Sequence, residues 1–278
     1  MSESEATTSA IERVTPQFVQ PTSNKRRVII LGASNVTRSF GTLVATVRSI
    51  SQEPLEIIAA HGHGRSYGTA WSAVLMRKLP GILSCGLWDS IRESTAPSSA
   101  LVTDIGNDLL YEHSVSTVAG WVEQCLDRLS AMSAQTIVTS LPVENILGIS
   151  EARYKFFRNL FVPGCSLSLR EMEGRARELD ERVRALAMSR SMMVVVPQRG
   201  WYGLDPMHIR IGHYPKAWRE VLGSWQSTTE MSGFSRGKWR ESLYLRTRIP
   251  ARVRWFNREL GAVQPCARLA DGTTIALY

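Results

Sequence analysis

Two short segments of this chain carry side chains that together could activate a serine hydroxyl. Ser34 follows a turn of small residues after the apolar run 28–31, and Asp205 lies three residues before His208. A carboxylate that close in sequence can hold Nδ1 of the imidazole, which leaves Nε2 to accept the serine proton. We therefore predict a nucleophile, Ser34, a base, His208, and a residue that orients the base, Asp205. The alternatives are that Ser34 only caps the following helix and that His208 belongs to an ordinary surface loop.

Two further segments offer donors that could stabilise an oxyanion. Asn107, in Gly106-Asn107-Asp108, follows the apolar stretch 100–103 and carries an amide N–H₂ group. The alternative for this segment is a simple turn that Asp108 holds in place. In the segment 61–66, Gly62 and Gly64 each permit a close backbone approach, so one of their N–H groups could point at a reacting oxygen.

The elements that must position these residues alternate along the chain. Short apolar runs rich in β-branched residues are separated by segments with helical periodicity. This order predicts a parallel sheet with helices on both faces, in which a ligand site lies beyond the carboxyl ends of the strands. The expected strands are 28–31, 55–60, 100–104, 136–141 and 192–196, and the expected helices are 35–50, 67–79, 115–131, 168–189 and 212–225.

Taken in chain order, the four segments resemble the sequence blocks of the SGNH (GDSL-like) hydrolases. Gly32-Ala33-Ser34-Asn35 matches the nucleophile block, Gly64 the glycine block, Gly106-Asn107-Asp108 the Gly-x-Asn-Asp block, and Asp205-x-x-His208 the closing block. The resemblance covers roughly residues 26–225. Ala33 stands where the family has an acidic residue before the serine, which leaves open what supports the nucleophile turn.

This resemblance implies a three-layer α/β/α flavodoxin-like fold with a five-stranded parallel sheet and a small C-terminal extension. It also implies hydrolysis of esters or thioesters through an acyl-serine, with no organic cofactor and no metal. The family's oxyanion hole maps onto the backbone N–H groups of Ser34 and Gly64 and the side chain of Asn107. Gly62 is then assigned to the turn.

Composition divides the chain into three parts and limits the partners. Residues 1–24 are polar, lack the apolar core of a secretory signal and are predicted to be disordered. Residues 25–225 form the hydrolase-like domain, and residues 226–278 form a C-terminal extension with a β-hairpin at Asp271-Gly272. The net charge is +8, but arginines are spread along the chain rather than clustered, which does not favour nucleic acid as a partner.

Cysteine spacing and hydropathy narrow the class of protein further. The four cysteines lie far apart, and the His61-Gly62-His63 pair has no third ligand nearby, so we predict neither a zinc site nor a disulfide framework. No stretch approaches 18 apolar residues, so no membrane span is expected. We expect a cytoplasmic enzyme that acts on a small or acylated substrate; its oligomeric state is not indicated.

Several alternatives remain open from the sequence. The aromatic segment 154–169 could line an acyl pocket, although such clusters more often belong to the core. Arg65 could contact an anionic substrate or pair with a local carboxylate. An acyltransferase would use the same residues, and a non-catalytic protein that binds glycans or anions would use the tryptophans and arginines near the C-terminus.

Overall fold

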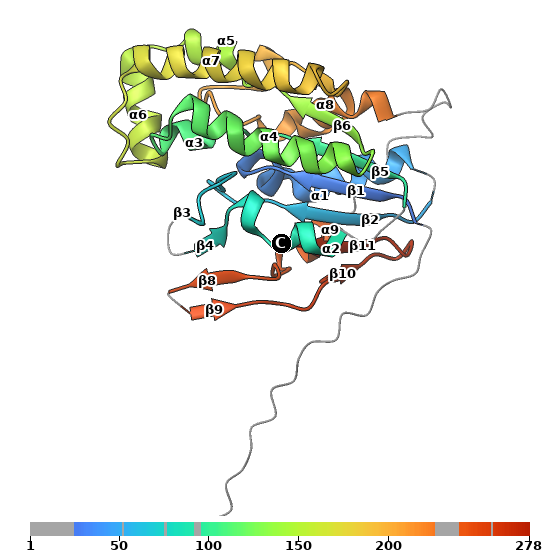
Figure 1. Ribbon diagram of the computed structural model, residues 1–278. Helices are drawn as coiled ribbons and strands as arrows, with labels where there is room; N and C mark the ends of the chain where they lie inside the picture. The colour runs from blue at the N-terminus through green and yellow to red at the C-terminus, as the bar shows by residue number, and fades with distance from the viewer. Residues whose placement is uncertain (1–24, 52, 75–76, 92–95, 226–238, 257) are drawn as a thin grey trace, which may run out of the picture.

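The centre of the protein is a seven-stranded sheet enclosed by helices (Figure 1). The computed structural model describes residues 25–51, 53–74, 77–91, 96–225, 239–256 and 258–278. The segment 1–24, predicted to be disordered, lies outside the described residues. The strand order is β10-β11-β2-β1-β5-β6-β7. The bounds are β1 Arg27–Leu31, β2 Glu56–Ala60, β5 Ser98–Val102, β6 Gln135–Thr139, β7 Met193–Val195, β10 Ala267–Arg268 and β11 Thr274–Leu277.

The five predicted parallel strands are confirmed as β2, β1, β5, β6 and β7. β1 pairs in parallel with β2 on one side and with β5 on the other, so the order of connection reverses next to β1. In an open α/β sheet this reversal leaves a crevice beyond the carboxyl ends of the strands. Ser34 follows β1 directly, and Asn107 comes shortly after β5, so the topology delivers both to that crevice.

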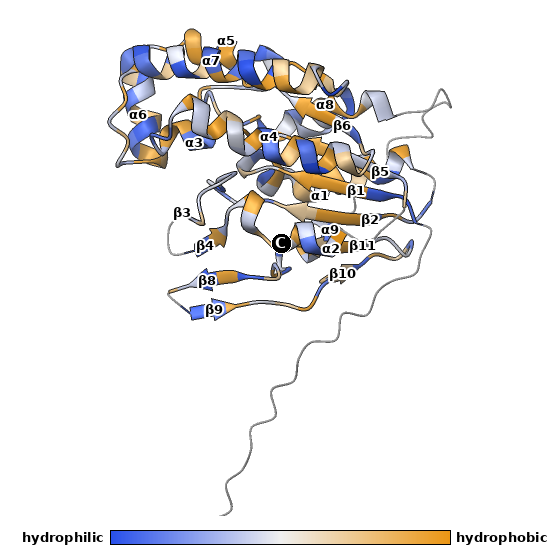
Figure 2. Cartoon of the chain, viewed as in Figure 1, coloured by the Kyte–Doolittle hydropathy of each residue, from blue (hydrophilic) through white to orange (hydrophobic). Residues whose placement is uncertain are grey.

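Helices cover both faces of the sheet, which explains why the strand β1 is buried along its whole length. Val28 and Ile30 pack in the cluster formed with α1 Ser34–Ile50 and α8 Tyr214–Val221. Ile29 and Leu31 pack on the opposite side, with α4 Val115–Ala131 and α7 Leu169–Met188. Figure 2 shows the apolar strands between these two helical layers. The three-layer arrangement that the sequence predicts is therefore confirmed.

The segment 67–79 was predicted to be helical, and this prediction is wrong. It forms an antiparallel pair, β3 Trp71–Val74 and β4 Arg77–Pro80. β4 also pairs with β8 Val253–Trp255, and β9 Arg258–Leu260 completes a second sheet of order β3-β4-β8-β9. The pairing with a strand far along the chain outweighs the local helical composition, because strand formation depends mainly on its neighbours.

The main sheet has more strands than the five predicted because the end of the chain joins it. β10 and β11 pair antiparallel on either side of Asp271-Gly272, where Gly272 has a φ of +85°. β11 then runs parallel to β2 and extends that side of the sheet. The predicted helix 212–225 is α8 flanked by 3-10 turns at Ile211–His213 and Gly223–Trp225. The remaining helices are α2 Leu87–Ile91, α3 Asn107–Leu110, α5 Val143–Leu147, α6 Glu151–Phe161 and α9 Trp239–Arg246.

Across the part of the chain that the structure describes, no helix is both long enough and apolar enough to cross a membrane.

Candidate active site

Ser34 is the first residue of α1 and lies at the carboxyl end of β1. The turn before it needs a residue without a side chain, because a Cβ on Gly32 would lie 2.5 Å from Cγ2 of Val36 and 2.9 Å from Cγ2 of Thr103. Ser34 is 8% exposed. The sequence therefore places a hydroxyl at the start of a helix, in a tight turn that opens onto the end of the sheet.

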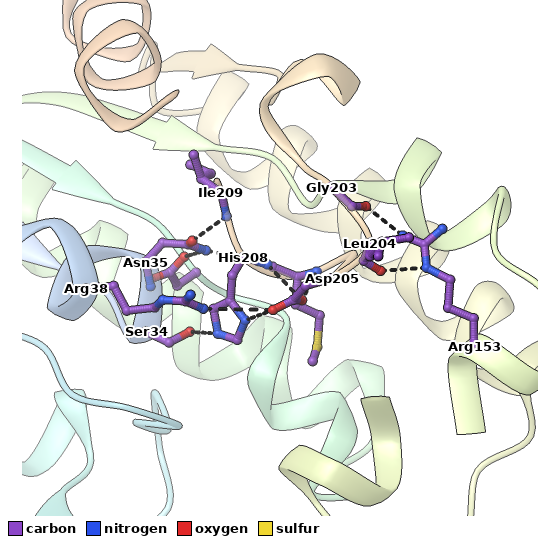
Figure 3. Close-up of polar contacts among 11 residues, drawn as sticks. Ser34, Asn35, Arg38, Arg153, Gly203, Leu204, Asp205, His208 and Ile209 are labelled. Carbon is purple, nitrogen blue, oxygen red and sulfur yellow. Dashed lines mark hydrogen bonds and ion pairs between the residues drawn. The ribbon is translucent and has the colours of Figure 1, made fainter. Parts of the chain in front are cut away.

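The three residues predicted to form a catalytic triad lie in hydrogen-bond contact (Figure 3). Nε2 of His208 is 2.9 Å from Oγ of Ser34, and Nδ1 of His208 is 2.6 Å from Oδ2 of Asp205. The other oxygen of Asp205, Oδ1, accepts hydrogen bonds from the backbone N–H groups of Met207 and His208 at 2.9 and 3.2 Å. The short loop from Asp205 to His208 thus aims both side chains at the nucleophile turn.

The surroundings of Asp205 favour its ionised form. Burial raises the pKa of this carboxyl, but the hydrogen bond and charge of His208 and the two backbone N–H groups outweigh burial and lower the pKa below its usual value. The guanidinium of Arg38 lies 3.8 Å from Oδ2. An ionised Asp205 holds the proton of the imidazole on Nδ1, so the lone pair of Nε2 faces Ser34.

Ala33 stands where the family has an acidic residue, so a different residue supports the turn that carries Ser34. That residue is Asp104, which the sequence analysis did not identify. Oδ2 of Asp104 accepts hydrogen bonds from the backbone N–H groups of Ala33 at 2.9 Å, Asn35 at 2.9 Å and Val36 at 3.3 Å. The N–H group of Ser34, between them, is not among these donors. A carboxylate at the N-terminus of a helix is favourable, and Asp104 reaches it with a φ of +60°. One signal in the sequence could have identified Asp104: it is an acidic residue at the end of the predicted strand 100–104, next to the site.

Asn107 begins α3 and lines the same cavity as Ser34. Its Nδ2 is buried and has no hydrogen-bond partner among the described residues. Asp108 accepts a hydrogen bond from the backbone N–H of Tyr67 at 2.9 Å and therefore holds the preceding loop against α3. The match to the Gly-x-Asn-Asp block is incomplete, because Ile105 stands two residues before Asn107, where that pattern has glycine.

Gly64 lies in a turn closed by a hydrogen bond from the N–H of Arg65 to the carbonyl of Gly62 at 3.2 Å. Gly64 has a φ of +58°, which favours glycine, and its carbonyl accepts from the hydroxyl of Tyr111 at 2.6 Å. Unlike Ser34 and Asn107, it is not among the residues that line the cavity. A Cβ on Gly62 would lie 2.2 Å from Cδ1 of Leu79. A side chain at Gly62 would therefore displace Leu79, while the oxyanion role of Gly64 stays a prediction.

The prediction that Arg65 contacts substrate is wrong. Its side chain is fully buried, and Nε donates to the carbonyl of Pro80 at 2.9 Å. NH1 donates to the carbonyls of His61 at 3.3 Å and Tyr278. These contacts tie the 61–65 loop to the end of β4 and to the segment after β11. Arg65 thus has a structural role and cannot reach a ligand from this position.

An apolar cavity of about 100 Å³ lies beside Ser34 and Asn107. Phe157 of α6 lines it, and the ring of Phe161 packs edge-on against that of His208 at 5.1 Å between centroids. Phe156 and Leu160 are 62% and 60% exposed, so the core interpretation of this aromatic segment is wrong for them. Further apolar side chains of the lining are Ile105, Leu109, Leu110, Leu141, Ile146, Ile149 and Met172.

Helix α6 is hydrogen-bonded to the loop that leads to His208. Nε of Arg153 donates to the carbonyl of Leu204 at 2.6 Å, and NH2 donates to the carbonyl of Gly203 at 2.7 Å (Figure 3). Because Asp205 comes next in the chain, these bonds fix the distance between the aromatic wall of the cavity and the Asp205–His208 loop.

His61 belongs to the packing behind the site. Its Nδ1 lies 3.0 Å from Oγ1 of Thr37, and its ring packs on Phe40 at 4.4 Å. Burial, reinforced by the charges of Arg65, Arg77 and His63, lowers the pKa of His61 from 6.5 to about 3. In the described residues no group of three or more His, Cys, Asp or Glu side chains could hold a metal ion.

This low pKa predicts how stability depends on pH. Above pH 6.5 His61 is neutral in both the folded and unfolded states. As the pH falls from 6.5 towards 3, only the unfolded state takes up the proton at this ring, so the free energy of unfolding decreases. His61→Asn, which keeps a polar atom near the position of Nδ1, should flatten this part of the curve. Urea unfolding from pH 7.5 to 4 checks it; a His61→Asn curve parallel to the wild-type curve would contradict the assignment.

Several solved structures are similar to this chain. One is a protein from Bacteroides fragilis assigned as an acylhydrolase, with a TM-score of 0.50 and 12% identity over 75% of this chain and 90% of that one. Others are a GDSL-like lipase from Bacteroides thetaiotaomicron (TM-score 0.49, 13% identity, 74% and 90% covered) and a psychrotrophic esterase from Pseudoalteromonas (0.45, 13%, 72% and 97%). No protein-family model and no curated protein matches the chain.

At these identities the likeness concerns the fold alone. The Bacteroides fragilis structure shows that the chain has the α/β/α fold that its resemblance to the SGNH hydrolases implies.

Proposed function

We propose that this protein is a serine hydrolase that cleaves carboxylic esters or thioesters through an acyl-serine intermediate. The observation that carries the proposal is the continuous line of contacts from Oδ2 of Asp205 through the ring of His208 to Oγ of Ser34, at 2.6 and 2.9 Å. It lies at the carboxyl ends of parallel strands and beside an apolar cavity, where ligands bind in α/β folds.

In the acylation step, Oγ of Ser34 attacks the carbonyl carbon of the ester while Nε2 of His208 accepts the hydroxyl proton. Asp205 stabilises the imidazolium that forms. The tetrahedral intermediate then collapses, His208 gives its proton to the leaving alcohol or thiol, and the acyl group remains on Ser34. Water then enters, loses a proton to His208 and attacks the acyl-serine. When this second tetrahedral intermediate collapses, His208 returns the proton to Oγ of Ser34 and the acid is released. No metal or organic cofactor takes part in these steps.

The negative charge of the intermediate needs donors on the side of the carbonyl oxygen. We assign these to the backbone N–H of Ser34, the side chain of Asn107 and the backbone N–H of Gly64. Two observations support the first two: Asp104 accepts from the N–H groups on either side of Ser34 but not from Ser34 itself, and Nδ2 of Asn107 is buried without a partner. The N-terminus of α1 adds a partial positive charge.

The cavity indicates which part of the substrate it accepts. Its lining is mostly aliphatic and aromatic, so an apolar acyl group fits it better than a sugar or a charged acyl group. Phe161 of α6 is 36% exposed and packs against His208, so a substrate bound at Ser34 would lie close to this ring.

The direct test is hydrolysis of p-nitrophenyl esters from acetyl to palmitoyl, together with labelling by a fluorophosphonate and mapping of the labelled residue. Turnover with a chain-length optimum, and a label on Ser34, would support the proposal. A folded protein that neither turns over any ester nor takes up the label would overturn it. Label on Ser34 with acyl transfer to an added alcohol in place of hydrolysis would assign the site to an acyltransferase.

The oxyanion assignment predicts a loss confined to the chemical step. Asn107→Ala should lower kcat about 100- to 1000-fold, since a single oxyanion donor contributes that much, and should change KM by less than about threefold. Gln135→Ala serves as the control. Gln135 is the first residue of β6, at the end of the strand away from the site, and its Nε2 donates to the carbonyl of Ser224. Steady-state kinetics on the best ester measures both. A large rise in KM with unchanged kcat would instead place Asn107 in ground-state binding.

A further inference from the structure

The side chain of Asn35 links the nucleophile turn to the histidine loop. Asn35 is only 6% exposed, and its amide makes three hydrogen bonds. Nδ2 donates to Oδ1 of Asp104 at 2.9 Å and to the carbonyl of Met207 at 3.1 Å. Oδ1 accepts from the backbone N–H of Ile209 at 2.9 Å (Figure 3). Both donor hydrogens and the acceptor of the amide are therefore used by atoms of the protein.

Two of these contacts lie on either side of the base. Met207 and Ile209 are the residues before and after His208, so the amide of Asn35 holds the backbone on both sides of the imidazole. Asn35 is also the residue after Ser34. The same side chain thus fixes the histidine backbone relative to the serine, 174 positions away in the sequence.

Asp104 in turn fixes the amide. Oδ2 of Asp104 accepts from the N–H groups of the nucleophile turn, while Oδ1 accepts from Nδ2 of Asn35. One carboxylate therefore orients both the serine turn and the side chain that holds the histidine loop. Because these groups are buried, their hydrogen bonds are strong and leaving one of them unpaired is costly.

We propose that Asn35 is a positioning residue that sets the contact between Oγ of Ser34 and Nε2 of His208. The proposal rests on the proposed hydrolase function and deepens it. Asn35 acts through His208, since its polar atoms are all taken up by the protein. A displacement of the imidazole by about 1 Å can cost a factor of about 100 in rate, so the amide should matter for kcat more than for substrate binding.

Asn35→Asp is the sharpest single variant because it preserves shape. It keeps an acceptor for the N–H of Ile209, but replaces the donor with an oxygen that faces Asp104 and the carbonyl of Met207. We expect kcat to fall about 100-fold with KM changed by less than about threefold. Thr46→Ala is the matched control: Thr46 is buried further along α1 and its hydroxyl donates to the carbonyl of Thr42 at 2.9 Å, away from Asn35, so its loss should leave kcat unchanged.

A double variant separates positioning from simple stability. In Asn35→Asp/Asp104→Asn, the amide introduced at position 104 can donate to the carboxylate introduced at position 35 and still accept from the turn. This restores the bond between the two positions, but leaves the carbonyl of Met207 without its donor. We expect the melting temperature to recover towards the wild-type value while kcat stays low. Recovery of kcat to within about threefold of wild type would overturn the proposal. This variant also decides the question if Asn35→Asp alone does not fold.

A readout that needs no turnover distinguishes failure of this proposal from failure of the proposed function. The proton between Nδ1 of His208 and Asp205 should give a far-downfield NMR signal, which Asn35→Asp should shift or broaden and Thr46→Ala should not. If the wild-type protein lacks serine-dependent activity, the hydrolase proposal fails, and this signal still tests Asn35. An unchanged signal in folded Asn35→Asp, or an unchanged kcat, would overturn the positioning role.

Discussion

Replacing Ser34 with alanine is expected to lower kcat for ester hydrolysis by about 10⁴-fold or more. The substitution removes the atom that we propose attacks the carbonyl, Oγ of Ser34, which lies 2.9 Å from Nε2 of His208. The proposed oxyanion donors and the cavity remain, so substrate binding should persist and KM should change little. Steady-state kinetics with the preferred p-nitrophenyl ester measures the effect.

The fold should survive this change, because alanine is favourable in a helix and only one hydroxyl group is removed, the one that lies against Nε2 of His208. A melting temperature close to that of the wild type, together with loss of fluorophosphonate labelling, is the expected control. Full activity in folded Ser34→Ala would show that another residue attacks the ester, and would remove the basis of the proposed mechanism.

Much of the fold could be predicted because local patterns and topology agreed. The five central strands are short β-branched runs between helical segments, and the rule that such strands pair in parallel placed them in one sheet. The failure at 67–79 has a physical cause: β4 is held by β8, whose sequence lies far away, and four-residue strands carry too little pattern to identify alone. The hairpin at Asp271-Gly272 could be predicted from its turn, but its pairing with the main sheet could not: β11 lies beside β2, which is more than 200 residues away in the sequence.

The site was predictable where chemistry depends on residue type and was missed where it depends on contact. Ser34, Asp205 and His208 stand out because few combinations of side chains activate a hydroxyl. Asp104 and Asn35 carry ordinary polar groups, and their roles come from hydrogen bonds across neighbouring loops that no spacing reveals. For Arg65, residue type suggested a role in binding that the structure does not support. Its charged side chain is buried and donates to backbone carbonyl groups.

Asp104 explains how this chain holds the turn at Ser34 without an acidic residue directly before the serine. The carboxylate lies on the adjacent strand end, at Asp104, and reaches the same helix N-terminus from the side. Because β1 and β5 are neighbours at the point where the strand order reverses, a residue after either strand can supply this charge. Removing the carboxylate with Asp104→Ala would thus disturb the serine turn and Asn35 at once.

The second large effect is expected for Asp205→Asn, which should lower kcat about 10⁴-fold at neutral pH. The backbone N–H groups of Met207 and His208 require an acceptor at position Oδ1, so the amide oxygen stays there and its nitrogen faces the imidazole. An amide nitrogen donates to Nδ1, which places the ring proton on Nε2. Nε2 then donates towards Ser34 and cannot accept its proton, although every heavy atom is nearly in place.

A similar carboxylate elsewhere gives the control for this variant. Asp271 also accepts a backbone N–H two residues on, that of Thr273 at 3.0 Å, and contacts a guanidinium, that of Arg48 at 2.6 Å. Asp271→Asn therefore repeats the change in charge and hydrogen bonding without an imidazole, and should leave kcat unchanged. Kinetics and melting temperatures of both variants are compared. Equal, small losses would mean that Asp205 only shapes its loop, whereas a large loss in Asp205→Asn alone means that it controls which nitrogen of His208 carries the proton.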